Sequence, residues 1–423
     1  MLQLQKIDNT IIFYFDLPIS MDIQNHKEFK RLSEMIQLIP NCHFEFGKNQ
    51  EILKCLLHYN SFMELIDKVL PSNQAFLQKE IIEYFYRQNS NDKKGLEINF
   101  HQKPYDNADR YWNFILNQGF FIEHFFNRIN WFLAPKNEYV THFPLHVDVE
   151  AASICNMNCP MCYRNQLKHT GQMDIGLFKK AVDECADNDV FSIRLSWRGE
   201  TLTHPMIKEM ISYATQKVKN VSFLTNAFYI DENMCDCFIE NQLSYIAVSF
   251  DGINEVYESI RHPAKFINSY KYLETLKNKK AKAGSKLPQV RLCTIWPAIK
   301  ENPDEYYNTM KNVSDYIVCN PYINFKGKIR LKKDFICQYP WERIVIGYDG
   351  TTQCCTGWNA DDIHLGNLKE VSIYKMWHSD LMKKVRSIHA SGRRMEINSC
   401  ANCRHGSETD PNISIWEIVD RKF

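Results

Sequence analysis

Two periodicities of apolar and polar residues divide the chain. Between residues 145 and about 325, short apolar runs of strand length alternate with longer segments whose apolar residues recur every three or four positions. The runs predict strands at 145–151, 190–196, 221–224, 245–249, 289–295 and 316–318. Because helices are expected between them, these β-α repeats predict a parallel sheet curved into a partial (β/α)6 TIM-like barrel. Ligands in such α/β folds bind at the carboxyl ends of the strands.

Local signals place two of the expected helices. Asp174 is suited to cap a helix whose Ile175, Phe178, Val182 and Cys185 share one face. The run Thr203-His-Pro205 predicts the start of a second helix, with proline near its first position.

The regions on either side of this barrel have a different character. Residues 1–140 predict an N-terminal α+β domain, with a strand at 11–15 and helices at 51–57, 62–70 and 76–87. Two interpretations stay open for it, a winged-helix-like peptide-recognition module and a generic cap. The barrel is assigned to residues 141–330. From 331 to 423 the alternation ends, which indicates a third domain.

Composition restricts the partners and the compartment. The 423 residues carry a formal net charge of +1, so no bulk field attracts nucleic acid or an anionic membrane. No apolar stretch approaches the ~18 residues that span a bilayer, and the N-terminus lacks a signal-peptide pattern. Fifteen cysteines in such a chain indicate a reducing, cytoplasmic setting, where clustered cysteines serve metal binding or catalysis.

The run Cys155-Asn-Met-Asn-Cys159-Pro-Met-Cys162 follows the first predicted barrel strand. Three thiolates at this C-x3-C-x2-C spacing suit a [4Fe–4S] cluster whose fourth iron has no protein ligand. A structural zinc site is the alternative. The arrangement resembles the radical S-adenosylmethionine (SAM) superfamily. The resemblance implies that these cysteines hold the cluster, which cleaves SAM to a 5′-deoxyadenosyl radical that abstracts hydrogen from a C–H bond. Met161 stands where the family often has an aromatic residue.

The resemblance also implies the residues that bind SAM. The turn Ser196-Trp-Arg-Gly199-Glu200-Thr matches the family's G-G-E-P pattern loosely, with Arg198 for the first glycine and Thr201 for proline. Glu200 would bind the methionine amino group and Arg261 the methionine carboxylate. Further positions that would meet the ribose or the substrate are Thr225, Asn226, Ser249 and Asp251. The alternative is that all of these are ordinary loop or surface residues.

The C-terminal region carries Cys337, the pair Cys354-Cys355, and Cys400-Ala-Asn-Cys403. Gly350 completes a C-x12-G-x4-C spacing that resembles the SPASM and twitch extensions of the superfamily. Because no cysteine follows Cys403, the resemblance implies the shorter twitch form, with one auxiliary [4Fe–4S] cluster on Cys337, Cys355, Cys400 and Cys403. Zinc is again the alternative. Spacing alone leaves open which member of the Cys354-Cys355 pair is the ligand.

The superfamily resemblance covers residues 145–410. Three features together look similar to radical SAM peptide epimerases of the proteusin type: the stretch Phe143-Pro-Leu-His-Val-Asp-Val-Glu-Ala-Ala-Ser before the motif, the long N-terminal region and a spare thiol. That resemblance implies abstraction of a Cα hydrogen from an L-residue of a ribosomal precursor peptide and return of hydrogen from a thiol, here Cys354, to give a D-residue. An electron donor such as flavodoxin or ferredoxin is implied as a partner. The alternatives are a dehydrogenase of a small alcohol such as an aminocyclitol, an enzyme that forms thioether cross-links in a peptide, and a non-enzymatic metal-cluster scaffold.

Overall fold

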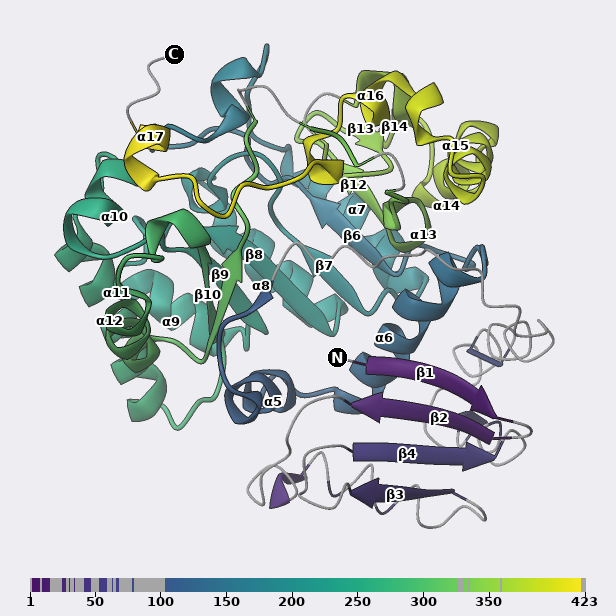
Figure 1. Ribbon diagram of the computed structural model, residues 1–423, viewed down its shortest axis with the longest axis horizontal. Helices are drawn as coiled ribbons and strands as arrows, with labels where there is room; N and C mark the ends of the chain where they lie inside the picture. Colours follow the sequence, from purple (N-terminus) through teal and green to yellow (C-terminus); the bar gives the residue numbers. More distant parts are fainter. Residues whose placement is uncertain are drawn as a thin grey trace.

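The computed structural model describes residues 103–325, 330–332, 335–357 and 360–419, together with four strands and several helical residues before position 103. The four strands form an antiparallel sheet in the order β1-β2-β4-β3 (Figure 1). Their bounds are Leu2–Ile7 (β1), Thr10–Phe15 (β2), Cys42–Phe46 (β3) and Leu53–His58 (β4).

The predicted strand at 11–15 is therefore confirmed as β2, whereas the predicted helix at 51–57 is wrong. That segment forms β4, which pairs along its full length with β2 on one side and with β3 on the other. Its dense apolar residues fit a helix and a strand equally well, and pairing with two neighbours decides the outcome. Met63, Ile66 and Asp67 are helical, as are Gln78 and Lys79, and the rest of the helices predicted at 62–70 and 76–87 lies outside the described residues.

Six parallel strands form the partial barrel, and all six predicted strands are confirmed. They pair in chain order, with bounds His146–Val149 (β6), Ser192–Arg194 (β7), Asn220–Thr225 (β8), Tyr245–Ser249 (β9), Gln289–Ile295 (β10) and Tyr316–Asn320 (β11). The helices between them are Ile175–Asp187 (α7), Ile207–Lys217 (α8), Glu232–Glu240 (α9), Asn254–Ile260 (α10), Phe266–Lys282 (α11) and Pro303–Met310 (α12).

The starts of α7 and α8 can be compared with the positions that the local sequence signals predict. The Asp174 carboxylate accepts hydrogen bonds from the backbone N–H groups of Gly176 and Leu177, so the predicted cap is confirmed. The face of α7 with Phe178 is buried. In contrast, α8 begins only at Ile207, because residues 201–203 form a separate 3₁₀ turn. Pro205 therefore lies before the helix.

Strands from both ends of the described chain extend the barrel sheet to ten strands. Lys103–Pro104 (β5) pairs with β11 at one edge. At the other edge Arg343–Ile346 (β12) runs parallel to β6, and Thr351–Gln353 (β13) and His364–Asn367 (β14) follow it. The C-terminal region also contains the helices Tyr339–Glu342 (α13), Ile373–Trp377 (α14), Asp380–Ala390 (α15), Asn398–Ala401 (α16) and Ile415–Val419 (α17).

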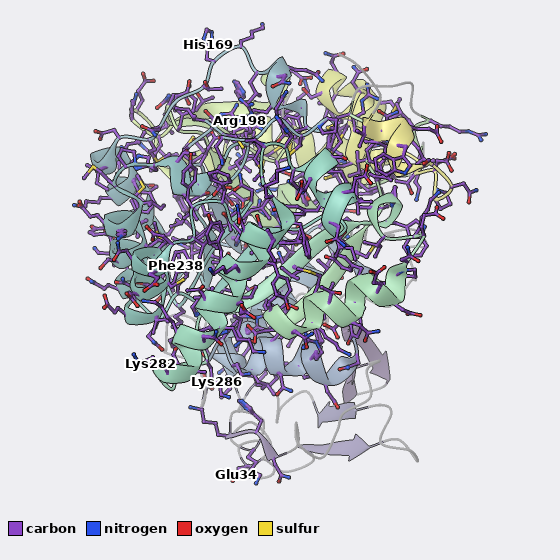
Figure 2. All side chains as sticks on the ribbon, turned by 90° about the vertical axis from the view of Figure 1, so that its left-hand side faces the viewer. Glu34, His169, Arg198, Phe238, Lys282 and Lys286 are labelled. Atoms are coloured by element: carbon purple, nitrogen blue, oxygen red, sulfur yellow. The ribbon has the colours of Figure 1, made fainter. Side chains whose placement is uncertain are left out.

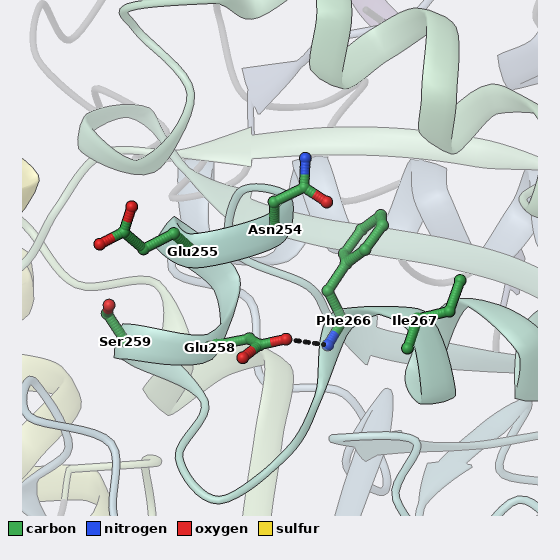
Figure 3. A pocket seen from close by; sticks show the side chains of 6 residues that line it. All are labelled: Asn254, Glu255, Glu258, Ser259, Phe266 and Ile267. Atoms are coloured by element: carbon green, nitrogen blue, oxygen red, sulfur yellow. Dashed lines mark hydrogen bonds between the residues drawn. The ribbon is translucent and has the colours of Figure 1, made fainter.

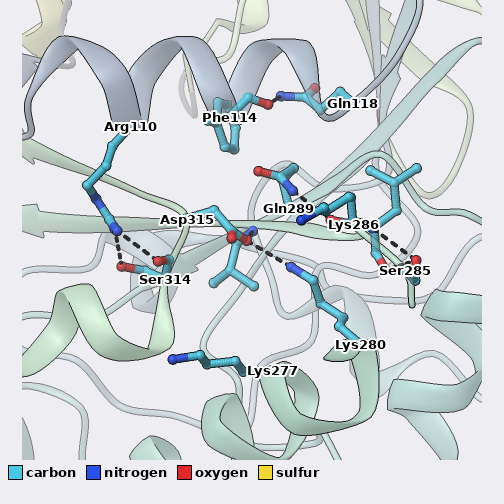
Figure 4. Close-up of polar contacts among 12 residues, drawn as sticks. Arg110, Phe114, Gln118, Lys277, Lys280, Ser285, Lys286, Gln289, Ser314 and Asp315 are labelled. Carbon is cyan, nitrogen blue, oxygen red and sulfur yellow. Dashed lines mark hydrogen bonds and ion pairs between the residues drawn. The ribbon is translucent and has the colours of Figure 1, made fainter. Parts of the chain in front are cut away.

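The barrel is closed at the amino ends of its strands by residues 103–136, which include Ala108–Leu116 (α5) and Phe121–Lys136 (α6). Arg110 of α5 donates to the Ser314 backbone oxygen at 2.9 Å (Figure 4). In Figure 2, His169 and Arg198 lie in the upper part of the view, and Lys282 and Lys286 lie well below them. The described part of the chain has no helix long and apolar enough to cross a membrane.

Strand β6 joins the barrel to the C-terminal region through buried charges. Its Val147 and Val149 belong to the apolar core, while the alternate residues His146 and Asp148, and Glu150 just after the strand, are buried polar side chains. Asp148, which is fully buried, contacts an arginine on each neighbouring strand, Arg194 at 2.7 Å and Arg343 at 3.3 Å. The pKa of Asp148 is lowered by these arginines and by His146 although burial alone would raise it.

Candidate functional site

The first cysteine cluster lies on the loop after β6, at the carboxyl ends of the barrel strands, as the sequence predicts. Burial raises the pKa of Cys159 to about 11, Arg261 opposes that rise, and Cys162 and Cys155 add to it. The three thiols are therefore neighbours in space. Among the described residues no three His, Cys, Asp or Glu side chains converge to hold a single metal ion. A cubane cluster differs from a single ion, since each thiolate binds a different iron atom.

The Gly199-Glu200 turn packs directly against this loop. A Cβ atom at Gly199 would lie 2.4–2.6 Å from backbone atoms of residues 152–154, so only glycine allows this approach. The Glu200 N–H donates to the Ile154 oxygen at 2.8 Å, which ties the turn to the residue before Cys155.

The Glu200 carboxylate is buried and connects two strand ends. It accepts hydrogen bonds from the Thr225 hydroxyl and the Asn226 N–H, both at 2.7 Å, and from the Leu202 N–H at 3.1 Å. Burial raises its pKa to about 6, although all three hydrogen bonds act in the opposite direction. Glu200, Thr225 and Asn226, predicted from separate motifs, thus form one hydrogen-bonded group.

This group reaches the first cysteine through two asparagines. The Asn226 side chain donates to the Asn156 side-chain oxygen at 2.8 Å, and Nδ2 of Asn226 lies 3.9 Å from the Cys155 Sγ. The Asn156 amide nitrogen is buried without a hydrogen-bond partner.

Asp251 and Arg261 approach the loop from the other side. Arg261 pairs with Asp251, and its Nη1 lies 3.7 Å from the Cys159 Sγ. Its Nε is buried without an acceptor. Ser249 lies at the end of β9 and pairs with Cys293 of β10. Two orphaned donors beside the cysteine loop fit a ligand that carries acceptors, as the methionine end of SAM does.

The second cysteine cluster gathers four thiols from three segments of the C-terminal region. Burial raises the pKa of Cys400 to about 12, and Cys355 and Cys403 raise it further. Burial also raises the pKa of Cys337, with further contributions from the other three thiols. Four mutually neighbouring thiols fit a fully ligated iron–sulfur cluster. Their assignment as its ligands stays a prediction.

The two adjacent cysteines have different surroundings. The Cys355 Sγ accepts an N–H from Gly357 at 3.3 Å, and a hydrogen bond from Cys354 lowers its pKa. That bond and burial raise the pKa of Cys354, which is 1% exposed in an apolar cluster that includes Trp377 and Met382. These environments favour Cys355 as the ligand.

A cavity of about 150 Å³ lies at the seam between the barrel and the C-terminal region. Its lining consists of Tyr163, Arg194, Trp197, Phe325, Thr356, Gly357, Cys403, Arg404 and His405. The Trp197 indole donates to the Thr356 oxygen at 3.0 Å, which fixes the seam at this point. The cavity therefore adjoins both cysteine clusters, with Tyr163 directly after one and Cys403 within the other.

None of the predicted SAM-site residues lines this seam cavity, and neither does Cys354. The sequence reasoning missed Arg194, although it alternates with buried Ser192 and Ser196 and so faces the barrel interior. Trp197 lies within the turn motif, but that pattern assigns it no role.

A second cavity, of about 430 Å³, is an open surface hollow on α10 and the start of α11 (Figure 3). It is lined by Asn254, Glu255, Glu258, Ser259, Phe266 and Ile267, and Glu258 there accepts the Phe266 N–H at 3.2 Å. It contains no residue of either cysteine cluster.

Fold and site together define a partial (β/α) barrel with a cysteine loop at the carboxyl ends of its strands and a cysteine-rich C-terminal domain. Residues 149–313 match the model of the radical SAM superfamily, and residues 337–404 match the SPASM iron–sulfur cluster-binding domain. Residues 149–313 therefore form a radical SAM domain and residues 337–404 a SPASM domain, and their cofactors are SAM, a [4Fe–4S] cluster and auxiliary iron–sulfur clusters.

Individual relatives are distant. The antilisterial bacteriocin subtilosin biosynthesis protein AlbA of Bacillus subtilis is 31% identical over 121 residues, which are 28% of this chain and 27% of that relative. The structure of BtrN in complex with AdoMet and 2-DOIA has 19% identity and a TM-score of 0.44, and covers 61% of this chain and 92% of that one. The structure of Streptococcus suis SuiB bound to S-adenosylmethionine has 13% identity and a TM-score of 0.48, with coverage of 82% and 90%.

Proposed function

We propose that this radical SAM enzyme modifies a ribosomally made precursor peptide by abstracting a hydrogen atom from a residue that enters the seam cavity. The observation that carries the proposal is the cavity that adjoins both cysteine clusters, through Tyr163 after Cys162 and through Cys403. When bound and reduced, the first cluster supplies the electron that converts SAM to the hydrogen-abstracting radical. The 31% identity with a bacteriocin biosynthesis protein supports a peptide substrate.

The residues around the first cysteine loop would hold SAM. Glu200 is proposed to accept the methionine ammonium, and its raised pKa would fall when that cation arrives. The buried nitrogens of Asn156 and Arg261 are suited to donate to the methionine carboxylate. Cys155, Cys159 and Cys162 would ligate the cluster.

The seam cavity has the chemistry to hold a peptide side chain. Tyr163, Trp197 and Phe325 supply aromatic surface, and Arg194 and Arg404 supply donors for backbone carbonyls or a carboxylate. Asp148 positions Arg194 from inside the barrel. The substrate therefore has to present a residue with an accessible C–H bond and nearby acceptors.

Recognition of the rest of the peptide is proposed for the N-terminal domain. Its sheet ends in β1 and β3, which have no further strand beside them among the described residues. Edge strands offer backbone donors and acceptors to an extended peptide. This arrangement supports the peptide-recognition interpretation over a simple cap.

Epimerisation is the first of two outcomes for the substrate radical. In it the Cα–H bond breaks, 5′-deoxyadenosine forms, and a thiol S–H bond returns hydrogen to the opposite face of Cα. The thiyl radical that remains needs one electron, which a flavodoxin or ferredoxin would supply, and one proton, which would come from solvent. Cys354 is the proposed hydrogen donor, and this role requires a movement that brings its buried thiol to the cavity.

Oxidation is the second outcome, and one observation favours it. Cys403, a proposed ligand of the auxiliary cluster, lines the cavity directly. A substrate radical held there could lose an electron to that cluster and a proton to solvent. The product would be a dehydrogenated or cross-linked peptide.

Mass spectrometry of a precursor peptide encoded near the gene would distinguish these outcomes. After incubation with reduced enzyme and SAM in D2O, epimerisation adds one deuterium at each modified Cα and leaves the mass in H2O unchanged. Oxidation removes two hydrogens in either solvent. Cleavage of SAM without any change in a series of such peptides would contradict the peptide proposal and direct the search to small alcohols.

A further inference from the structure

His389 lies near the end of α15 and is 2% exposed, so its ring nitrogens meet protein groups and not bulk water. The two nitrogens contact two of the proposed auxiliary-cluster cysteines. The Cys337 N–H donates to Nδ1 at 3.4 Å, and Nε2 lies 3.4 Å from the Cys400 Sγ. No motif of the sequence analysis included this histidine.

The contact with Cys337 fixes where the ring carries its proton. A backbone N–H can only donate, so Nδ1 has to be the acceptor and carries no hydrogen. The neutral ring then holds its proton on Nε2. Because Nε2 is the nitrogen that faces Cys400, the N–H points at the sulfur.

A buried arginine holds the backbone around this contact. Arg394, 1% exposed, donates to the backbone oxygens of Cys400 at 3.2 Å, Lys332 at 2.6 Å and Gly406 at 3.2 Å. A Cβ atom at Gly406 would lie 2.4 Å from the Arg394 Nη1, so the guanidinium fits closely. The segment that carries Cys400 is thereby kept in place relative to His389.

We propose that His389 is a positioning residue that donates an N–H···S hydrogen bond to the Cys400 thiolate and raises the reduction potential of the auxiliary cluster. Hydrogen bonds to ligand sulfurs are among the factors that set cluster potentials, since they stabilise the more negative, reduced form. Gly357 donates a similar bond to Cys355 from the backbone. The inference rests on the proposed ligand set of the auxiliary cluster.

The test uses the full-length chain with Cys155, Cys159 and Cys162 replaced by alanine, so that only the auxiliary cluster is reconstituted. Its midpoint potential is measured by redox titration with electron paramagnetic resonance detection. His389→Phe removes the donor and is expected to shift the reduction equilibrium about tenfold toward the oxidised form. For a one-electron couple this corresponds to a midpoint potential that is about 59 mV lower. His389→Gln, whose Nε2 can still donate, is expected to keep most of the wild-type potential.

His378→Phe is the matched control. His378 lies in the same domain as His389, but its Nε2 contacts the His142 backbone oxygen of the barrel domain at 2.9 Å and no cysteine, so the potential is expected to be unchanged. The chain that lacks only the first three cysteines should also show a coupling between ¹⁵N-labelled histidine and the reduced auxiliary cluster. This measurement does not depend on the folding of any His389 variant.

An unchanged potential in His389→Phe, or the absence of the ¹⁵N coupling, overturns the inference. A different failure would concern the ligand set. If the chain without the first three cysteines binds no cluster at all, the proposed auxiliary site is wrong, whatever His389 does.

Discussion

Replacing Asp148 by asparagine tests whether the buried charges of β6 hold the barrel and the C-terminal region together. Asparagine preserves the shape and removes the charge that faces Arg194 at 2.7 Å and Arg343 at 3.3 Å. Because Asp148 is fully buried, Arg194 loses this carboxylate partner in a poorly solvated place, and Arg343 keeps the more distant Glu342 at 3.7 Å. Removing one partner of a buried pair costs about 3–5 kcal/mol, and we expect a loss of this size in the free energy of unfolding.

Asp183→Asn is the matched control for this effect. Asp183 makes contacts that are at least as short, with Lys217 at 2.6 Å and Tyr213 at 2.7 Å, but its side chain is 42% exposed. Surface ion pairs contribute about 0–1 kcal/mol, so this variant should unfold close to the wild type. Anaerobic urea titrations followed by tryptophan fluorescence compare the two. Equal shifts of the unfolding midpoint in both variants would refute the reasoning, since burial would then make no difference.

Three further predictions concern the site and its surroundings. Gly199→Ala should destabilise the protein by about 1–3 kcal/mol and reduce the iron bound at the first loop, because its Cβ meets backbone atoms at 2.4–2.6 Å; normal iron content measured on the purified variant would contradict this. Cys355→Ala should lose the auxiliary cluster's iron while Cys354→Ala retains it, and the reverse result in the same assay would exchange their roles. Burial lowers the pKa of His146 to about 4 against the partial opposition of Asp148, so on acidification the unfolded chain takes up the proton first. The contribution of His146 to the free energy of unfolding is fully present above about pH 6.5 and falls by up to about 3 kcal/mol toward pH 4. His146→Gln should flatten this part of the plot of unfolding free energy against pH, and an unchanged slope would refute the assignment.

The barrel could be predicted from the sequence because its signals are local and repeated. Each strand of the barrel is a short apolar run between helices of regular period, and the cysteine loop follows the first of them. The wrong helix at 51–57 shows where this information ends. Its apolar residues fit the periods of both a helix and a strand. The segment forms a strand because it pairs with β2 and β3, which lie elsewhere in the sequence.

The site was only partly predictable for a related reason. Glu200, Thr225 and Asn226 come from motifs at strand ends, and parallel strands bring those ends together. His389 and Arg404 belong to no spacing pattern, since their positions depend on how the C-terminal segments pack. The sequence could not separate Cys354 from Cys355 either, whereas the packing of Cys354 against the apolar cluster distinguishes them.

The contacts of Arg198 explain why the turn at residues 196–201 departs from the family's G-G-E-P pattern. Arg198, which stands where the family pattern has glycine, donates to both oxygens of Glu150 at 2.8 and 2.6 Å. Its guanidinium lies 3.8 Å from the Trp197 ring, and the Trp197 indole donates to the Thr356 oxygen in the C-terminal domain. Glu150 also accepts the Tyr348 N–H at 3.1 Å, just after β12.

Arg198 therefore does more than replace a small residue in a turn. It connects the end of β7 to β6, and through Glu150 and Trp197 to the segments on both sides of β13. These contacts, with the parallel pairing of β6 and β12, fix the first cysteine loop relative to the auxiliary cysteines. Electron transfer and radical chemistry both depend on such a fixed separation. A glycine at position 198 would match the family pattern more closely and would remove this connection, so the departure is best understood as part of how this chain builds its seam.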